Sequence, residues 1–88
     1  MYRYWGGKSA RIGAWLSCGY TPVHAARLGL SLPPGNTAEF VSAVTVPAGT
    51  RVQRGTAAPL FGQPGGFPQV LLLDRIPSAN FSSGEPTV

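Results

Sequence analysis

Charged residues are scarce in this 88-residue sequence, at 11% of the chain compared with about a quarter in an average globular protein. Only Glu39, Asp74 and Glu85 are acidic, and the formal net charge is +4. These three acids lie far apart along the chain and form no carboxylate pair of the kind that glycosidases use. A positive balance is compatible with a polyanionic partner. Because the arginines are dispersed, a small anionic ligand is favoured over a broad nucleic-acid surface.

Cysteine is nearly absent. Cys18 is the only one, which excludes an internal disulfide, and one cysteine with the single histidine His24 cannot build a zinc site. No apolar run approaches the length of a membrane span, and the first residues lack the pattern of a signal peptide. The sequence also lacks the GxSxG, GxGxxG and Walker motifs, so neither a serine hydrolase nor a phosphate-binding loop is predicted. A triad of Ser17 or Ser42 with His24 and Asp74 has no support from spacing.

What the sequence does have is 12 glycines and 9 prolines, which favour short strands and long connections. Alternating or apolar patterns predict strands at residues 2–5, 14–17, 39–46, 50–55 and 69–74. We expect 39–46 and 50–55 to form a hairpin, and 69–74 to be a central strand covered on both faces. One helix is predicted over residues 21–30, with Thr21 as its N-cap and Gly29 at its end. Its spacing buries Val23 and Ala26 on one face and directs His24 and Arg27 elsewhere.

These patterns predict a small α+β domain with five or six short strands, one short helix and long loops. We expect one domain over residues 1–76 and a polar, partly mobile tail over 77–88. Long loops on so small a scaffold usually line a binding site.

Two strands combine polar groups with large rings. In the first, Arg3 is flanked by Tyr2, Tyr4 and Trp5; an arginine so placed can bind a phosphate bidentately while the rings stack on a base. An aromatic core strand with a solvated arginine explains the same residues about equally well. In the second, Ser17 stands close to Trp15, a pattern that a core tryptophan and an edge serine explain better when taken alone.

Two polar turns complete the candidate set. Asn36 and Thr37 lie at the entry to a long strand, where they are also ordinary residues for starting a strand. Gly65 and Gly66 precede Gln69 at the start of the apolar strand. Glycines let the backbone approach a ligand closely, whereas a flexible loop followed by a strand-start glutamine is the alternative.

Taken in order, the blocks YRYWGG, GAWLS, LPPGNTAEFVS and GGFPQV resemble small C-terminal toxin domains of bacterial polymorphic toxins, of the Rhs-linked type, in the ADP-ribosyltransferase superfamily. The segment APLFGQPGGFPQ is similar to the end of tuberculosis necrotizing toxin domains, which are NAD glycohydrolases. The resemblance covers residues 2 to 74. Each block is weak alone, and the order of the four carries the likeness.

The resemblance implies an ADP-ribosyltransferase-like split β-sheet with NAD⁺ as substrate in its cleft, and no metal. Arg3, Ser17 and Gln69 would be the catalytic residues, with Ser42 as the alternative to Ser17. Arg3 would hold the phosphates or ribose, and Gln69 would occupy the place where many transferases carry a glutamate. The further NAD-binding residues it implies are Tyr2, Tyr4, Trp5, Gly6, Trp15, Asn36, Thr37, Phe40, Ser42, Gly65 and Gly66.

Gln69 is the point at which the sequence departs from the transferase pattern. An amide keeps the hydrogen-bonding shape of a glutamate and loses its charge. Necrotizing-toxin-like domains are similar in using glutamine and hydrolyse NAD⁺, so the resemblance implies hydrolysis over ADP-ribose transfer. A transferase that modifies a protein or nucleic acid of a competitor cell and an inactivating substitution at Gln69 remain alternatives. A third is a basic binding module without catalysis. The resemblance also implies a secreted or delivered effector that acts in the cytoplasm of the target cell and has an acidic immunity protein, with no membrane partner.

Overall fold

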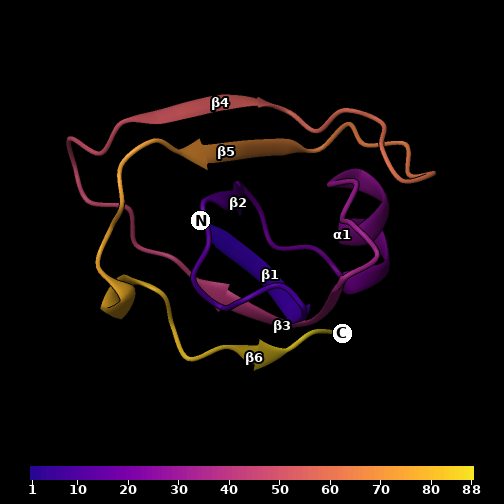
Figure 1. The fold of residues 1–88 in the computed structure, drawn as a ribbon, viewed down its shortest axis with the longest axis horizontal. Coiled ribbons are helices and arrows are strands. Elements are labelled where there is room, and N and C mark those ends of the chain that lie inside the picture. Colours follow the sequence, from indigo (N-terminus) through magenta and orange to yellow (C-terminus); the bar gives the residue numbers. More distant parts are fainter.

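A six-stranded antiparallel sheet and a single α-helix make up the fold in a computed structural model, which describes residues 1–88. The sheet order is β4-β5-β2-β1-β3-β6, and a 3-10 turn, Ser78–Asn80, precedes the last strand (Figure 1). The elements are β1 (Tyr2–Gly7), β2 (Trp15–Ser17), α1 (Val23–Gly29), β3 (Asn36–Ala43), β4 (Val52–Thr56), β5 (Pro68–Leu72) and β6 (Glu85–Pro86). The expected α+β class with short strands and one short helix is therefore confirmed. The helix, at seven residues, is too short to cross a membrane.

The sheet consists of two three-stranded groups, β4-β5-β2 and β1-β3-β6, that are joined at one point. Between β1 and β2 only Tyr2 and Ser17 are Cα partners, whereas β1 and β3 share five pairs and β4 and β5 also share five. In Figure 1, β4 and β5 run along the top, and β1 and β3 run obliquely below them. The two groups therefore diverge on either side of a single residue pair.

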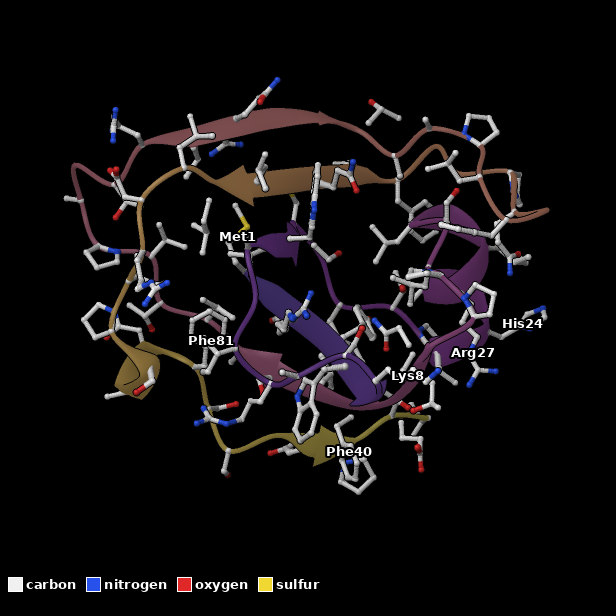
Figure 2. The ribbon with its side chains drawn as sticks, in the orientation of Figure 1. Met1, Lys8, His24, Arg27, Phe40 and Phe81 are labelled. Carbon is white, nitrogen blue, oxygen red and sulfur yellow. The ribbon has the colours of Figure 1, made fainter.

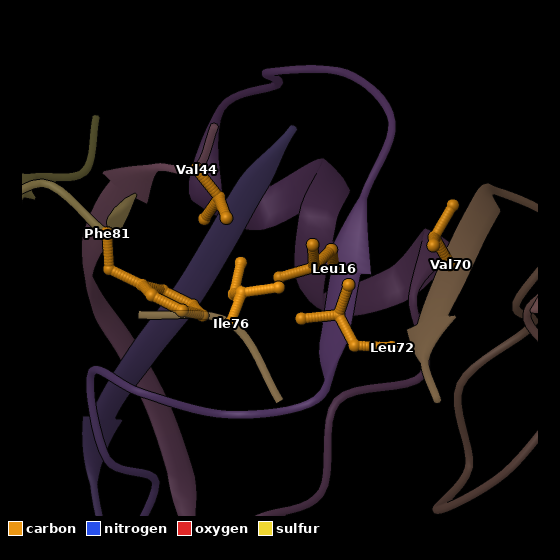
Figure 3. Close-up of a cluster of buried hydrophobic side chains, with 6 residues drawn as sticks. All are labelled: Leu16, Val44, Val70, Leu72, Ile76 and Phe81. Atoms are coloured by element: carbon orange, nitrogen blue, oxygen red, sulfur yellow. The ribbon is translucent and has the colours of Figure 1, made fainter. Parts of the chain in front are cut away.

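The hydrophobic core has two clusters, and the larger one contains residues from both groups of strands. The larger cluster gathers around β2 and β5 and consists of Leu16, Val44, Val70, Leu72, Ile76 and Phe81 (Figure 3). The smaller cluster lies between the helix and the strands β1 and β3, and consists of Tyr4, Ala26, Ala38 and Val41. Helix α1 buries Ala26 and exposes His24 and Arg27, which Figure 2 shows on its outer side. This helical pattern was expected from the sequence.

Residues 77–88 carry part of the core and of the sheet. Phe81 is 3% exposed and bridges to Val44, and the Arg11 guanidinium donates a hydrogen bond of 2.9 Å to the Phe81 carbonyl oxygen. Strand β6 then pairs with β3, and the Val23 backbone N–H donates to the carbonyl oxygen of Val88 at 2.7 Å. A domain boundary at residue 76 and a mobile tail stay predictions, but the side chain of Phe81 packs with the strands that precede that boundary.

The helix starts two residues later than expected, at Val23, and the prediction of Thr21 as its N-cap is wrong. Pro22 occupies the N-cap position, and no side chain caps the helix. Thr21 is engaged elsewhere, because its backbone N–H donates to the Tyr4 hydroxyl at 2.8 Å and its carbonyl accepts from the same hydroxyl at 2.6 Å. A tertiary contact with a buried tyrosine has replaced the local capping pattern.

The hairpin expected between residues 39–46 and 50–55 does not form. Strand β3 pairs with β1 and β6, and β4 pairs with β5. Beyond Ala43 the chain stays beside the same neighbours, because the N–H of Val44 donates to the carbonyl of Met1 at 2.7 Å and that of Thr45 to the carbonyl of Asn80 at 2.9 Å. The apolar strand β5 is second from the sheet edge and is not covered on both faces, since Leu72 is buried while the next residue, Leu73, is 52% exposed.

We predict that Phe81→Ala lowers the free energy of unfolding by about 3–5 kcal/mol, the usual cost of truncating a buried phenylalanine. Urea unfolding followed by circular dichroism measures this. Leu73→Ala is the matched control, because Leu73 is apolar but half exposed, and it is expected to cost less than about 1 kcal/mol. A Phe81→Ala variant as stable as the Leu73 control would contradict the packing of residues 77–88 described above.

The exposed Arg51–Asp74 pair gives stability a pH dependence. The Arg51 guanidinium donates twice to Asp74 Oδ1, at 2.6 and 2.9 Å, and this hydrogen bonding lowers the pKa of Asp74 below its ordinary value. A carboxyl with a lowered pKa in the folded state stabilises the fold above its unfolded pKa and loses that contribution as the pH falls through the folded pKa.

We therefore predict that the stability difference between the wild type and Asp74→Asn is largest at neutral pH and shrinks below about pH 4. The urea midpoints of both proteins between pH 2 and 7 measure it. A difference that stays constant over this range would show that the charge of Asp74 does not contribute.

Candidate functional site

A pocket of about 540 Å³ lies where β1 and β2 diverge. Continuing the register of the Tyr2–Ser17 pair would place Arg3 opposite Leu16 and Tyr4 opposite Trp15, but neither pair forms, and all four residues line the pocket instead. The other walls come from the segment after α1, the loop between β4 and β5, and Gln69 on β5. The pocket lies within the usual size range for small-molecule sites, about 300–1,000 Å³.

The apolar part of the lining is contributed mainly by Trp15, Leu30, Leu32, Leu60 and Phe61, and its polar part by Arg3, Ser9, Ser17, Ser31, Asn36 and Gln69. A mostly apolar pocket with a few convergent polar groups is typical of a ligand site. No group of three or more histidine, cysteine or acidic side chains is placed to hold a metal ion. The geometry is that of a site for an organic ligand.

Arg3 is the cation of the pocket and has no acidic partner. Its guanidinium donates to the carbonyl oxygens of Trp15, at 3.3 Å, and Ala10, at 3.1 Å, while its buried Nε has no hydrogen-bond partner. Burial lowers the pKa of the Arg3 guanidinium, but an arginine stays charged at neutral pH. A partly buried positive charge with an unused donor is costly unless an anion meets it. The pocket is thus electrostatically suited to an anionic group.

Ser17 and Gln69 lie side by side. They are Cα partners on β2 and β5, and both line the pocket. The Ser17 hydroxyl donates to the carbonyl oxygen of Gly19 at 2.7 Å and accepts from the Gly19 N–H at 3.4 Å, which fixes its orientation in a local turn. The three residues expected to be catalytic, Arg3, Ser17 and Gln69, are therefore brought to one pocket from three strands.

Ser42, the alternative to Ser17, lies outside the pocket lining. Its side chain is fully buried, and its Oγ accepts a hydrogen bond of 2.9 Å from Trp5 Nε1. Trp5 in turn stacks on Phe40 with ring centroids 4.6 Å apart, and a side chain at Gly84 would collide with it. Trp5, Phe40 and Ser42 thus form a packing group between β1, β3 and the residues before β6.

Of the remaining residues predicted to bind NAD⁺, some line the pocket and others do not. Tyr4, Trp15 and Asn36 line the pocket; the Asn36 side chain donates to the Tyr4 carbonyl oxygen at 3.0 Å and so also ties β3 to β1. Tyr2 instead packs edge-on against Tyr20, at 5.7 Å between ring centroids. The four further residues outside the lining are Gly6, Thr37, Gly65 and Gly66.

Gly65 and Gly66, in the segment GQPGG at residues 62–66, stabilise the loop between β4 and β5. Gly65 has a φ of +69°, and a Cβ there would collide with the carbonyl oxygen of Ala57. Its N–H donates to the carbonyl of Leu28 at 2.9 Å, and the N–H of Gly66 donates to that of Ala57 at 2.9 Å. The first bond ties the loop between β4 and β5 to the end of α1, and the second lies within the loop. The same loop carries Leu60 and Phe61, which line the pocket.

Two residues that line the pocket, Leu60 and Phe61, were not predicted from the sequence. Leu60 and Phe61 are 54% and 57% exposed, line the pocket, and lie in the loop between β4 and β5. Ser31, behind them, donates to the carbonyl of Ala58 at 2.6 Å. Two large apolar residues inside a glycine- and proline-rich loop are a usable signal, since such residues are seldom left in a loop without a contact to make.

Comparisons with protein-family models, with curated proteins and with solved structures gave no match. The likeness to toxin domains stays a prediction from the sequence blocks alone. The site must therefore be interpreted from its own chemistry.

We predict that inorganic pyrophosphate stabilises the protein through Arg3. At ten times its Kd, a ligand that binds only the folded state adds about 1.4 kcal/mol, which raises the Tm of a domain of this size by several degrees. Thermal unfolding with and without pyrophosphate measures the effect. Arg3→Met should abolish it, while Arg54→Met, which removes an exposed arginine outside the pocket, should not. An equal response in all three proteins would mean that the anion binds elsewhere.

Proposed function

We propose that this chain is an NAD⁺-consuming toxin domain that cleaves the bond between nicotinamide and ribose. The observation that carries the proposal is the lining of one pocket by Arg3, Ser17 and Gln69, which come from three different strands. The order of the four sequence blocks points to the same three residues. An ADP-ribosyltransferase-like arrangement is part of the proposal, and the divergence of β1 and β2 at the pocket supports it.

The chemistry needs little beyond what the pocket contains. Breaking the C–N bond sends its electron pair to nicotinamide and leaves an oxocarbenium-like ribose, to which water adds with loss of a proton to solvent. Such a reaction is accelerated by holding the dinucleotide in place and excluding bulk water. Arg3 lines the pocket and offers its positive charge to a phosphate, and the Trp15 ring, which is half exposed at the pocket, offers a stacking surface.

Ser17 and Gln69 would act on the nicotinamide-side ribose. The Ser17 oxygen already donates its hydrogen to Gly19 and can still accept one from a ribose hydroxyl. The Gln69 amide can donate and accept, and can orient a water, but it offers no negative charge to the developing cation. The preference for hydrolysis to nicotinamide and ADP-ribose over transfer to an acceptor rests on the resemblance to necrotizing toxin domains, which also carry glutamine at this place.

The wider biological setting is proposed on the resemblance alone. It consists of delivery into the cytoplasm of a target cell and neutralisation by an acidic immunity protein. The net charge of +4 is consistent with an acidic partner.

The first test is release of nicotinamide from NAD⁺ by the purified domain, followed by chromatography. Arg3→Ala should lower the rate about a hundredfold or more, the usual loss when a donor to a charged group is removed from an active site. Arg54→Ala is the matched control and should keep the wild-type rate, because Arg54 is exposed on β4. Full activity of Arg3→Ala would refute the role of Arg3.

The second test addresses Gln69. Gln69→Glu introduces a charge that stabilises the cationic transition state, and it should raise the rate of nicotinamide release, whereas Gln69→Ala should lower it. Labelled NAD⁺ added to a cell lysate separates the two reactions, because free ADP-ribose indicates hydrolysis and a labelled macromolecule indicates transfer. Absence of nicotinamide release from both the wild type and Gln69→Glu would eliminate the proposal.

A further inference from the structure

Strand β4 is an open edge of the sheet. It is the terminal strand of the order β4-β5-β2-β1-β3-β6, and residues 53–56 are exposed. Its five residues pair with β5 in unbroken register, with no bulge to twist the edge away. The opposite edge is unlike it, because β6 has only two residues and one is Pro86, which has no N–H. Only the β4 edge offers a continuous template for another strand.

The backbone groups that β4 offers can be assigned from its register. Arg51 and Leu73 form a hydrogen-bonded pair just before β4, through the Leu73 N–H and the Arg51 carbonyl at 2.9 Å. Ala57 and Phe67 form another just after it, through the Ala57 N–H and the Phe67 carbonyl at 2.9 Å. In an antiparallel ladder such pairs alternate. The odd-numbered residues of β4 therefore bond to β5, and Val52, Arg54 and Thr56 direct their N–H and C=O groups outward.

Charge decides which kind of strand fits this edge. Segment 51–56 contains Arg51 and Arg54 and no acid. Arg51 is already engaged by Asp74, while Arg54 is exposed and makes no ion pair. A second copy of β4 would bring two uncompensated Arg54 side chains close together, and like charges on adjacent strands are destabilising. An acidic residue opposite Arg54 would instead form a cross-strand ion pair.

We propose that β4 binds an extended acidic segment of a partner protein as a seventh strand. The partner's backbone would bond to the outward groups of Val52, Arg54 and Thr56, and a carboxylate would lie opposite Arg54. Val52, Arg54 and Thr56 do not line the pocket of Arg3, Ser17 and Gln69, so the proposal does not depend on cleavage of NAD⁺. Binding by main-chain hydrogen bonds requires little sequence identity in the partner, and the charge pattern provides the selectivity.

The probe is a blocked eight-residue peptide of alternating valine and glutamate, used at concentrations at which it is monomeric. One of its faces would present carboxylates to Arg54, and the other would present valines beside Gln53 and Gly55 of β4. The matching peptide of alternating valine and lysine is the control. Fluorescence anisotropy of the labelled peptides measures binding. We expect the acidic peptide to bind and the basic one not to, and equal binding of both would overturn the proposal.

Two substitutions distinguish the contribution of the Arg54 charge to binding from that of the backbone hydrogen bonds. Arg54→Glu replaces an attraction by a repulsion and should weaken binding of the acidic peptide about tenfold. Thr56→Pro removes one outward N–H without removing a bond to β5, and it should weaken binding while Thr56→Val, which keeps the N–H, should not. Circular dichroism and Tm must show that both Thr56 variants are folded as the wild type is. Unchanged affinity in folded Thr56→Pro and Arg54→Glu would overturn the proposal.

Amide hydrogen exchange distinguishes backbone pairing with β4 from a purely electrostatic association of the peptide with Arg54. The amides of Val52, Arg54 and Thr56 should exchange more slowly by at least tenfold when the acidic peptide is bound. Those of Gln53 and Gly55, already bonded to β5, should change little. Protection spread equally over both sets, or sedimentation showing that the protein alone dimerises through β4, would overturn the assignment of an acidic partner strand.

Discussion

The fold depends on the single pair of Cα partners, Tyr2 and Ser17, that joins the two halves of the sheet. One step further along the same two strands, the ladder is open. Arg3 partly replaces the missing bonds by donating to the carbonyl oxygen of Trp15. The divergence creates a pocket inside a sheet that would otherwise be continuous, and the larger hydrophobic cluster, which contains Val70 of β5 and Val44 after β3, holds the two halves together. The pocket thus forms where β1 and β2 do not pair with each other.

The sequence predicted the parts of the fold that depend on local pattern. The helix face with Ala26 inside and His24 outside follows from helical spacing, and the short strand 15–17 follows from its apolar residues and the glycine before it. Strand partners were less predictable. A hairpin was expected across the PAG turn, but Val44 bonds to Met1 and β4 bonds to β5. Pairing is decided by contacts between distant residues, for which periodicity holds no information.

The candidate site was likewise predicted only in part. Arg3, Ser17 and Gln69 were chosen from resemblance, and they line one pocket. Trp5 and Ser42 were chosen on the same grounds, yet they are engaged with each other, because neighbouring positions on β1 and β3 face the same side of the sheet. Arg3 lies on the same face of β1 as Trp5 and yet lines the pocket, so the face alone does not decide which side chain reaches the pocket. Arg3 lies where β2 has diverged, whereas Trp5 lies against Phe40 and Gly84. A sequence gives the alternation of faces but not the position of the neighbouring segments.

The first and last strands of the chain meet in the same part of the sheet. Met1 bonds to Val44, β3 lies between β1 and β6, and the carbonyl of Val88 bonds to Val23. Few of these contacts can form early, since loop closure over such long sequence separations must come first. During synthesis on the ribosome, the sheet cannot be completed until residue 88 has emerged from the exit tunnel. Folding of these residues is therefore expected to be slower than that of a domain of the same size whose contacts are mostly local.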